Sequence, residues 1–164
     1  MSSRPDVTAM LSAELERQVL SKFRLWGSEV KLCEGDRFGA PQGGRVDYMA
    51  FEPLDMSCSV RSIEAGTVHV FEVKSCMADL KSGHGMNLVG DVNWLVCTAD
   101  LWREIIDKHV NVSGWKPLVW EWVKPGKFNP TTARYEAFEI TGRKMPVSKA
   151  IWLILMASGK AVKR

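Results

Sequence analysis

The sequence has little of what marks membrane-spanning, secreted or zinc-binding proteins. Its longest apolar run, residues 150–157, falls far short of the ~20 residues that a helix needs to cross a bilayer. The first residues do not show a basic segment followed by an apolar one, so no signal peptide is expected. The four cysteines lack CxxC spacing, which argues against zinc and predicts reduced thiols in a cytoplasmic protein: Cys33, Cys58, Cys76 and Cys97.

Several signatures of catalysis and repetition are also missing. The chain has no Walker loop, no dinucleotide-binding glycine fingerprint and no Ser-His-Asp arrangement, which excludes the chemistries that depend on those motifs. It has no internal repeat and no low-complexity segment. Excess charge is small as well, since the net charge is +3 and the pI is near 8.7. A weakly basic chain is compatible with a nucleic-acid partner but is no proof of one.

The composition is that of a globular protein with a hydrophobic core. Of the 164 residues, 46% are hydrophobic and 25% are charged. This length predicts a single domain over residues 1–164. Residues 124–164 are expected to form a C-terminal extension packed on the core.

Hydrophobic periodicity predicts helices alternating with strands. Helices are expected over residues 8–26, within 77–89 after a turn, and over 101–110 with Asp100 as the N-cap. Strands are expected over residues 29–33, 45–51, 68–75, 92–97 and 117–123, with loops over 34–44 and 52–66. This order predicts an α/β fold in which a mixed β-sheet is flanked by helices.

The tail is expected to contain a turn, a strand and a final helix. The turn covers residues 124–127, the strand covers 134–140 and the helix covers 147–161. The helix is expected to pack its apolar side chains against the core: Ile151, Trp152, Ile154 and Leu155.

Charged residues stand at the end of the most strand-like segment, residues 68–75. Glu72 and Lys74 are two apart, so they project to the same face of a strand. A buried strand tolerates two such charges only when they are paired or bind something. Asp47 begins a second strand-like run, and pairing of the two strands would bring the three side chains together. The alternative is an ordinary ion pair on an exposed strand.

Two carboxylates and a lysine in one cleft are what metal-assisted phosphodiester hydrolysis requires. Carboxylates bind a hard cation such as Mg²⁺, and a lysine can orient the attacking water or help to deprotonate it.

These residues resemble the D…(D/E)xK signature of the PD-(D/E)xK nuclease superfamily. The resemblance extends through residues 72–80, EVKSCMADL, which are similar to a segment of MmcB-like DNA-repair nucleases and related phage proteins. Asp91 and the strand that follows it also resemble those relatives, and the likeness covers about residues 12–123. One departure is that Val46, not proline, precedes the first acid. The resemblance implies a restriction-endonuclease-like core.

The resemblance also implies a set of metal ligands. Asp47 and Glu72 would hold Mg²⁺ or Mn²⁺, and the backbone carbonyl of Val73 would complete the shell. Lys74 would position the water and stabilise charge on the phosphate. Glu16, in the pair Glu16-Arg17, matches a glutamate that the superfamily often places beside the metal, although a solvated helix acid explains it equally well.

The expected activity is a metal-dependent deoxyribonuclease, most simply an endonuclease, in DNA repair, recombination or phage DNA processing. The alternative is a catalytically inactive nucleic-acid-binding or assembly module of the same fold. The protein is expected to be cytoplasmic and bacterial or phage-encoded, and a homodimer is compatible with the resemblance. DNA phosphates are expected to contact basic side chains around the cleft or in the tail: Arg37, Arg45, Lys81, Lys149 and Lys160.

Overall fold

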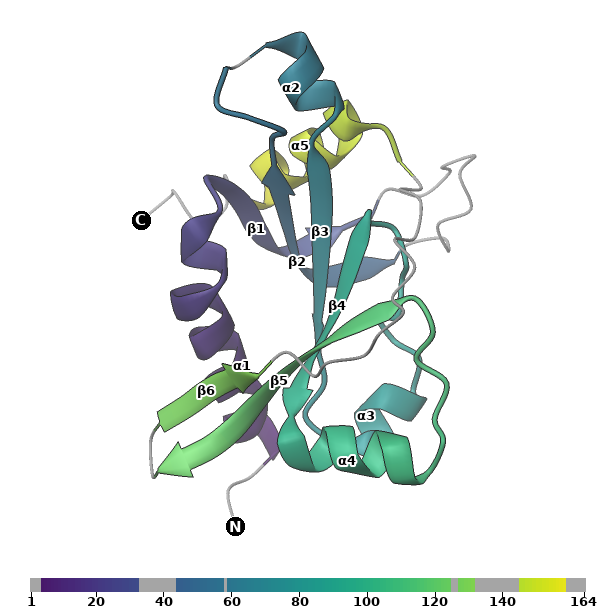
Figure 1. Ribbon diagram of the computed structural model, residues 1–164. Coiled ribbons are helices and arrows are strands. Elements are labelled where there is room, and N and C mark those ends of the chain that lie inside the picture. The colour runs from purple at the N-terminus through teal and green to yellow at the C-terminus, as the bar shows by residue number, and fades with distance from the viewer. Residues whose placement is uncertain (1–3, 33–43, 58, 125–126, 132–144, 159–164) are drawn as a thin grey trace.

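The computed structural model of the chain describes residues 4–32, 44–57, 59–124, 127–131 and 145–158. Six strands form one sheet in the order β1-β2-β3-β4-β5-β6 (Figure 1). The strands are β1 (Leu25–Lys31), β2 (Arg45–Glu52), β3 (Thr67–Val73), β4 (Val92–Thr98), β5 (Trp115–Lys124) and β6 (Lys127–Thr131). The helices are α1 (Arg4–Gln18), a 3-10 turn (Leu20–Lys22), α2 (Val60–Glu64), α3 (Met77–Lys81), α4 (Ala99–Asp107) and α5 (Val147–Ser158).

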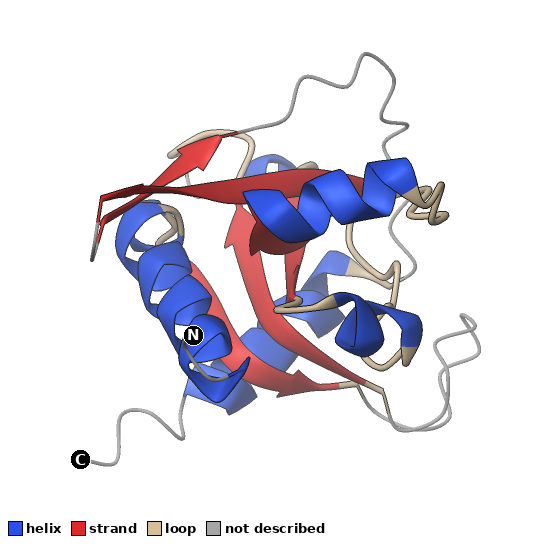
Figure 2. Cartoon of the chain, turned by 90° about the horizontal axis from the view of Figure 1, so that it is seen from below, coloured by secondary structure: helices blue, strands red, loops and turns tan. Residues whose placement is uncertain are grey.

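The sheet is mixed. β1, β2 and β3 are antiparallel neighbours, whereas β3, β4 and β5 run parallel and β6 returns antiparallel. The parallel connections pass through α3 and α4, as parallel strands require. The predicted α/β class, with a mixed sheet flanked by helices, is confirmed, and helices lie on both sides of the sheet (Figure 2).

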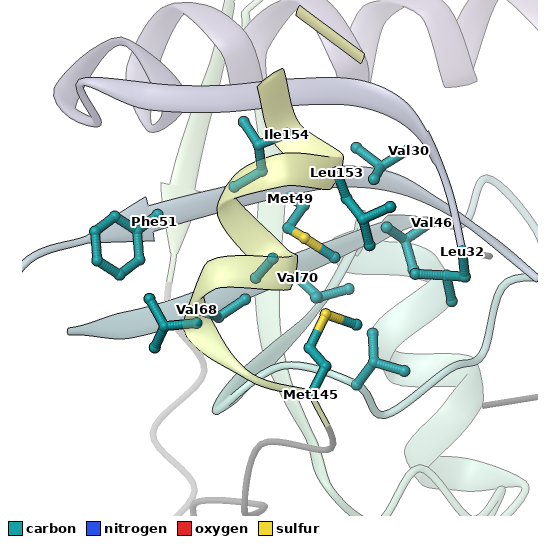
Figure 3. Close-up of a cluster of buried hydrophobic side chains, with 13 residues drawn as sticks. Val30, Leu32, Val46, Met49, Phe51, Val68, Val70, Met145, Leu153 and Ile154 are labelled. Atoms are coloured by element: carbon teal, nitrogen blue, oxygen red, sulfur yellow. The ribbon is translucent and has the colours of Figure 1, made fainter. Parts of the chain in front are cut away.

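Alternation along the strands assigns each helix to a face of the sheet. On one face, α1 packs Leu11 and Leu15 against Phe71 and Trp120. On the opposite face, α5 covers β1 to β3, where Leu153 and Ile154 meet Met49 and Val70 (Figure 3). α3 and α4 cover β4 and β5 on that same face, through residues such as Leu101 and Ile105. The charged end of β3 therefore lies between two apolar clusters.

The first helix is shorter than predicted. Its helical pattern was expected to continue to Trp26, but α1 ends at Gln18, and Trp26 and Gly27 belong to β1. They pair with Ala50 and Met49 of β2, so cross-strand pairing overrides the local apolar spacing. Gly27 lets the sheet approach α5, because a Cβ there would lie 3.0 Å from the carbonyl oxygen of Ile154.

Three predicted connections differ in detail. The segment between β2 and β3 contains α2, which Ser59 caps by accepting a hydrogen bond from Ser62 N at 3.0 Å. Asp100 is not the N-cap of α4: Thr98 Oγ1 accepts from Leu101 N at 3.3 Å, and Asp100 already lies in the first helical turn. After β3 the helix comes first and the glycine-containing turns follow it, the reverse of the predicted order.

In the tail, α5 forms as predicted, and two of its four predicted core residues, Ile151 and Ile154, pack against the core. Val147, Ala150, Leu153 and Ile154 are buried, whereas Trp152 and Leu155 are 60% and 50% exposed. β6 pairs with β5 just after the predicted turn. The strand expected over residues 134–140 lies outside the described residues. No helix in the described ranges is long and apolar enough to cross a membrane.

Candidate active site

Asp47 and Glu72 meet where β2 begins and β3 ends. The two strands pair as predicted, with Tyr48 opposite Phe71, and one further step of this register puts Asp47 beside Glu72. The Asp47 carboxylate also accepts a hydrogen bond from the backbone N–H of Val73 at 2.8 Å. Burial is the main cause that raises the pKa of Asp47, while the Val73 hydrogen bond opposes the rise. The pairing of two extended strands thus brings together acids that are 25 positions apart in the sequence.

Glu72 is a buried carboxylate with an incomplete set of partners. Its exposed fraction is 3%. One oxygen, Oε1, accepts a hydrogen bond from Lys74 Nζ at 3.1 Å, but Oε2 has no hydrogen-bond partner among the described residues. Burial, followed by repulsion from the Asp47 charge, raises the pKa of Glu72 to about 7. An orphaned, buried carboxylate oxygen is a position where a cation or a donor would be stabilising.

Lys74 is as deeply buried as Glu72, at 3% exposure. Besides Glu72, its ammonium donates to the backbone carbonyl oxygen of His84 at 2.6 Å. Asp79 Oδ1 lies 3.9 Å from the same nitrogen. The strand-end lysine is therefore fixed between two carboxylates and one carbonyl, and the buried charge is paired as physical chemistry requires.

The turn after α3 is shaped around the Glu72 carboxylate. Gly85 has a positive φ of 76°, a conformation that side-chain-bearing residues rarely adopt. A Cβ on Gly85 would lie 1.8 Å from Glu72 Oε1, so the absence of a side chain is required by space as well. Lys74 then ties this turn to the end of β3 through His84. The sequence does not predict this contact, because it joins residues from two elements.

A pocket of about 690 Å³ opens over these side chains. Its floor and walls come from α1, β1, β2, β3, α3 and the turn after α3, and they carry four acidic and two basic side chains among the described residues. The acidic side chains are Glu29, Asp47, Glu72 and Asp79, and the basic ones are Arg45 and Lys74. This excess of negative charge repels a phosphate group unless a cation compensates it.

Other predicted residues lie at varied distances from the pocket. Arg45 lines it and forms an exposed ion pair with Glu29. Glu16 is exposed and accepts a hydrogen bond from Tyr48 OH at 2.9 Å. Tyr48 lines the pocket and Glu16 does not, so Glu16 contacts the pocket wall only through the Tyr48 hydroxyl.

Some predicted nucleic-acid contacts lie away from the pocket. Lys81 is exposed on α3 and Lys149 lies on α5, and neither belongs to the lining. Arg37 and Lys160 lie outside the described residues. Of the four cysteines, Cys76 and Cys97 are described, and both are free thiols.

Sequence reasoning did not select several residues that shape the pocket. Thr8 and Ser12 of α1 contribute hydroxyl groups to the wall, and Asn87 donates to the backbone carbonyl of Arg45 at 3.3 Å. Positions 8 and 12 are about one helical turn apart, so their hydroxyl groups share a face of the helix. This spacing is the feature by which the sequence could have identified them.

The carboxylates at this site suit an ion of the magnesium type better than a metal that is surrounded by protein ligands alone. Within the described ranges there is no group of three or more His, Cys, Asp or Glu side chains arranged to hold a metal. Two adjoining carboxylates with one orphaned oxygen do fit Mg²⁺, which keeps several waters and binds through one or two carboxylates.

Comparison of the chain with protein-family models, with curated proteins and with solved structures gave no match.

Proposed function

We propose that the protein is a divalent-metal-dependent deoxyribonuclease of the PD-(D/E)xK type, acting as an endonuclease. The observation that carries the proposal is the meeting of Asp47, Glu72 and Lys74 at the floor of one pocket, with one Glu72 oxygen unpartnered among the described residues. The two acids lie on β2 and β3 and Lys74 follows directly after β3, which is the order that the motif predicts. An ordinary exposed ion pair would not be 3% exposed at both partners.

The strand order supports a restriction-endonuclease-like core. An antiparallel unit, β1 to β3, is followed by parallel strands, with the first acid on β2 and the Glu-x-Lys segment at the end of β3. In this scheme Asp47, Glu72 and the Val73 carbonyl would hold Mg²⁺ or Mn²⁺, which would supply charge compensation and activation of the attacking water. Lys74 stabilises negative charge on the phosphate and holds Glu72 in place.

DNA is the proposed substrate, in repair, recombination or phage DNA processing in a bacterial or phage-infected cytoplasm. Arg45, at the pocket rim, is the proposed phosphate contact nearest the acids. Lys81 and Lys149, which do not line the pocket, remain proposed contacts, as do Arg37 and Lys160 outside the described ranges. A basic contact is needed because the pocket itself is rich in carboxylates.

A second candidate is a nucleic-acid-binding or assembly module that has lost turnover. It is favoured by the state of Lys74, whose ammonium is already engaged by Glu72 and by the His84 carbonyl. A lysine held in this way must exchange a partner before it can act on water or phosphate. The two candidates therefore differ in whether a bound cation lets the Lys74 ammonium leave one of these partners and act on water or phosphate.

The deciding experiment is a cleavage assay on linear duplex, branched and single-stranded DNA with Mg²⁺, with Mn²⁺ and with a chelator. Cleavage that requires the metal and disappears in Asp47→Asn and Glu72→Gln supports the nuclease. Asp107→Asn is the matched control, since Asp107 is an exposed acid at the end of α4. Binding of DNA without cleavage by the parent protein in any metal would support the inactive module. Absence of both binding and cleavage would reject both candidates.

A further inference from the structure

The large hydrophobic side chains that face solvent are concentrated at one end of the molecule. Seven such side chains are 40–76% exposed in the part of the chain that the structure describes. Six of them lie on α5 and on residues 54–60, two segments that meet where α2 contacts α5 (Figure 1). These six form what we call the α2–α5 patch: Leu54, Met56, Val60, Trp152, Leu155 and Met156.

α5 is apolar on both of its sides. Its inner side packs on the sheet through residues such as Leu153 and Ile154 (Figure 3). Its outer side presents Trp152, Leu155 and Met156, which are 60%, 50% and 53% exposed. These three positions have helical spacing and share one face. A helix that is hydrophobic all round is normally buried all round, so the outer side of α5 has the character of a covered surface.

Charge in the two segments is sparse and balanced. α5 contains one charged residue, Lys149, and residues 54–64 contain Asp55, Arg61 and Glu64. Two acids and two bases leave no net charge, although the chain as a whole carries +3. A phosphate backbone would need an excess of positive charge here, so the patch does not suit nucleic acid. A surface without net charge can meet its own copy without like-charge repulsion.

We propose that the α2–α5 patch is the interface of a symmetric homodimer, covered by a second copy of this chain. A two-fold axis makes the same patch serve on both subunits, which needs a self-compatible surface of this kind. Trp152 is the expected anchor, because tryptophan is enriched among the side chains that dominate interface energies. β2 begins at the pocket and ends next to the patch, so dimerisation leaves both pockets open. The dimer does not depend on the proposed nuclease activity.

Sedimentation velocity of the full chain over a range of concentrations tests the proposal. The parent protein should dimerise reversibly, and Trp152→Glu should weaken the dimer by at least ~30-fold, the effect of a hot-spot residue. Ile106→Glu is the matched control, because Ile106, at 40% exposure, is the exposed large hydrophobic that lies outside the patch within the described part of the chain. It should dimerise like the parent.

A second variant, Leu155→Lys, separates dimer loss from misfolding. Leu155 is half exposed, so at concentrations where the parent is monomeric the change should leave the thermal midpoint close to that of the parent, while at higher concentrations only the parent should dimerise. A parent protein that stays monomeric at every concentration would overturn the proposal and leave the patch to a different partner. Equal weakening by Ile106→Glu and Trp152→Glu would also overturn it, since the contact would then not be local to the patch.

Discussion

Apolar side chains are usually buried and charged side chains exposed, and the two ends of the β2–β3 strand pair depart from this rule in opposite ways. At the end that opens into the pocket, Glu72 and Lys74 are charged and each 3% exposed. At the other end, beside α2 and α5, Val60 and Trp152 are apolar and 76% and 60% exposed. Between them the same strands carry an ordinary apolar core.

Each reversal costs free energy in the isolated chain, and each predicts its own kind of partner. Buried charge is stable only when it is paired, so the pocket end, with one Glu72 oxygen unpartnered among the described residues, suits the proposed cation. Exposed apolar surface is stabilised by exclusion of water, so the α2–α5 end calls for a protein surface. The kind of side chain that is out of its usual place, charged and buried or apolar and exposed, therefore indicates the kind of partner that binds at each end.

The largest expected effect is from Lys74→Met, which breaks the buried pair. Loss of one partner of a buried ion pair costs about 3–5 kcal/mol of the free energy of unfolding. Protonation of Glu72 should reduce this cost at neutral pH, because its pKa is already raised to about 7. If the proposed function holds, cleavage should fall by at least ~100-fold. Urea denaturation and the cleavage assay measure the two effects.

Two controls separate stability from chemistry in that experiment. Leu153→Ala removes a buried side chain of α5 that does not line the pocket, and it should cost about 2–5 kcal/mol without slowing cleavage. Lys108→Met removes an exposed lysine whose pair with Glu104 lies on α4, and it should change neither quantity. Equal loss of cleavage in Leu153→Ala and Lys74→Met would mean that the pocket responds to global stability alone.

Glu72 should make the protein less stable as pH rises. Because folding raises its pKa from the ordinary 4.5 to about 7, the protonated form is favoured in the folded state. The stability is therefore complete below pH ~4.5 and is lost as pH rises through ~7, by roughly 3 kcal/mol in total. Glu72→Gln should remove this dependence, so the two proteins should diverge with pH in chelator-containing buffer. A constant difference between them from pH 5 to pH 8 would contradict the raised pKa.

Gly85→Ala should distort the same end more gently. Gly83 and Gly85 both have positive φ, near 70° and 76°. An alanine at either position costs about 1–2 kcal/mol from backbone strain. Only at Gly85 would the new Cβ collide with Glu72, since nothing lies within 4 Å of a Cβ at Gly83. Calorimetric titration with Mn²⁺ should show weaker binding in Gly85→Ala and parent-like binding in Gly83→Ala. Equal affinity in both would show that Glu72 does not hold the ion.

The sequence predicted the strands better than the helix ends. Alternation of apolar residues located β2, β3, β4 and β5, and the position of Asp47 and Glu72 on paired strands followed from them. The end of α1 was missed, because Trp26 has helical spacing but is recruited by β2. Thr98 was missed as a cap because an acid two residues later looked equally suitable.

The chemistry of the site was only partly readable from the sequence. The spacing of Glu72 and Lys74 predicts a shared face, and both lie in the pocket. It does not predict that Lys74 binds the His84 carbonyl, since backbone carbonyls carry no residue identity. The outward turn of Trp152 was also unpredictable, because α5 is apolar all round and periodicity cannot choose between its faces.

The smallest expected effect is from Arg45→Gln at the rim of the pocket. Arg45 and Glu29 form an ion pair in which both side chains are more than half exposed, so its loss should cost less than about 1 kcal/mol. The informative quantity is instead the salt dependence of DNA binding. If Arg45 contacts a duplex phosphate, the slope of log K against log salt should become shallower by ~0.9. Arg103→Gln is the matched control, because Arg103 is similarly exposed and paired with Asp100 on α4. A slope unchanged in Arg45→Gln would move the phosphate contacts away from the carboxylates, to Lys81 or to the basic residues of the tail. The pocket end would then bind a cation but would not hold the DNA backbone. The two ends of the strand pair would differ in that one binds a metal ion and the other binds a protein surface.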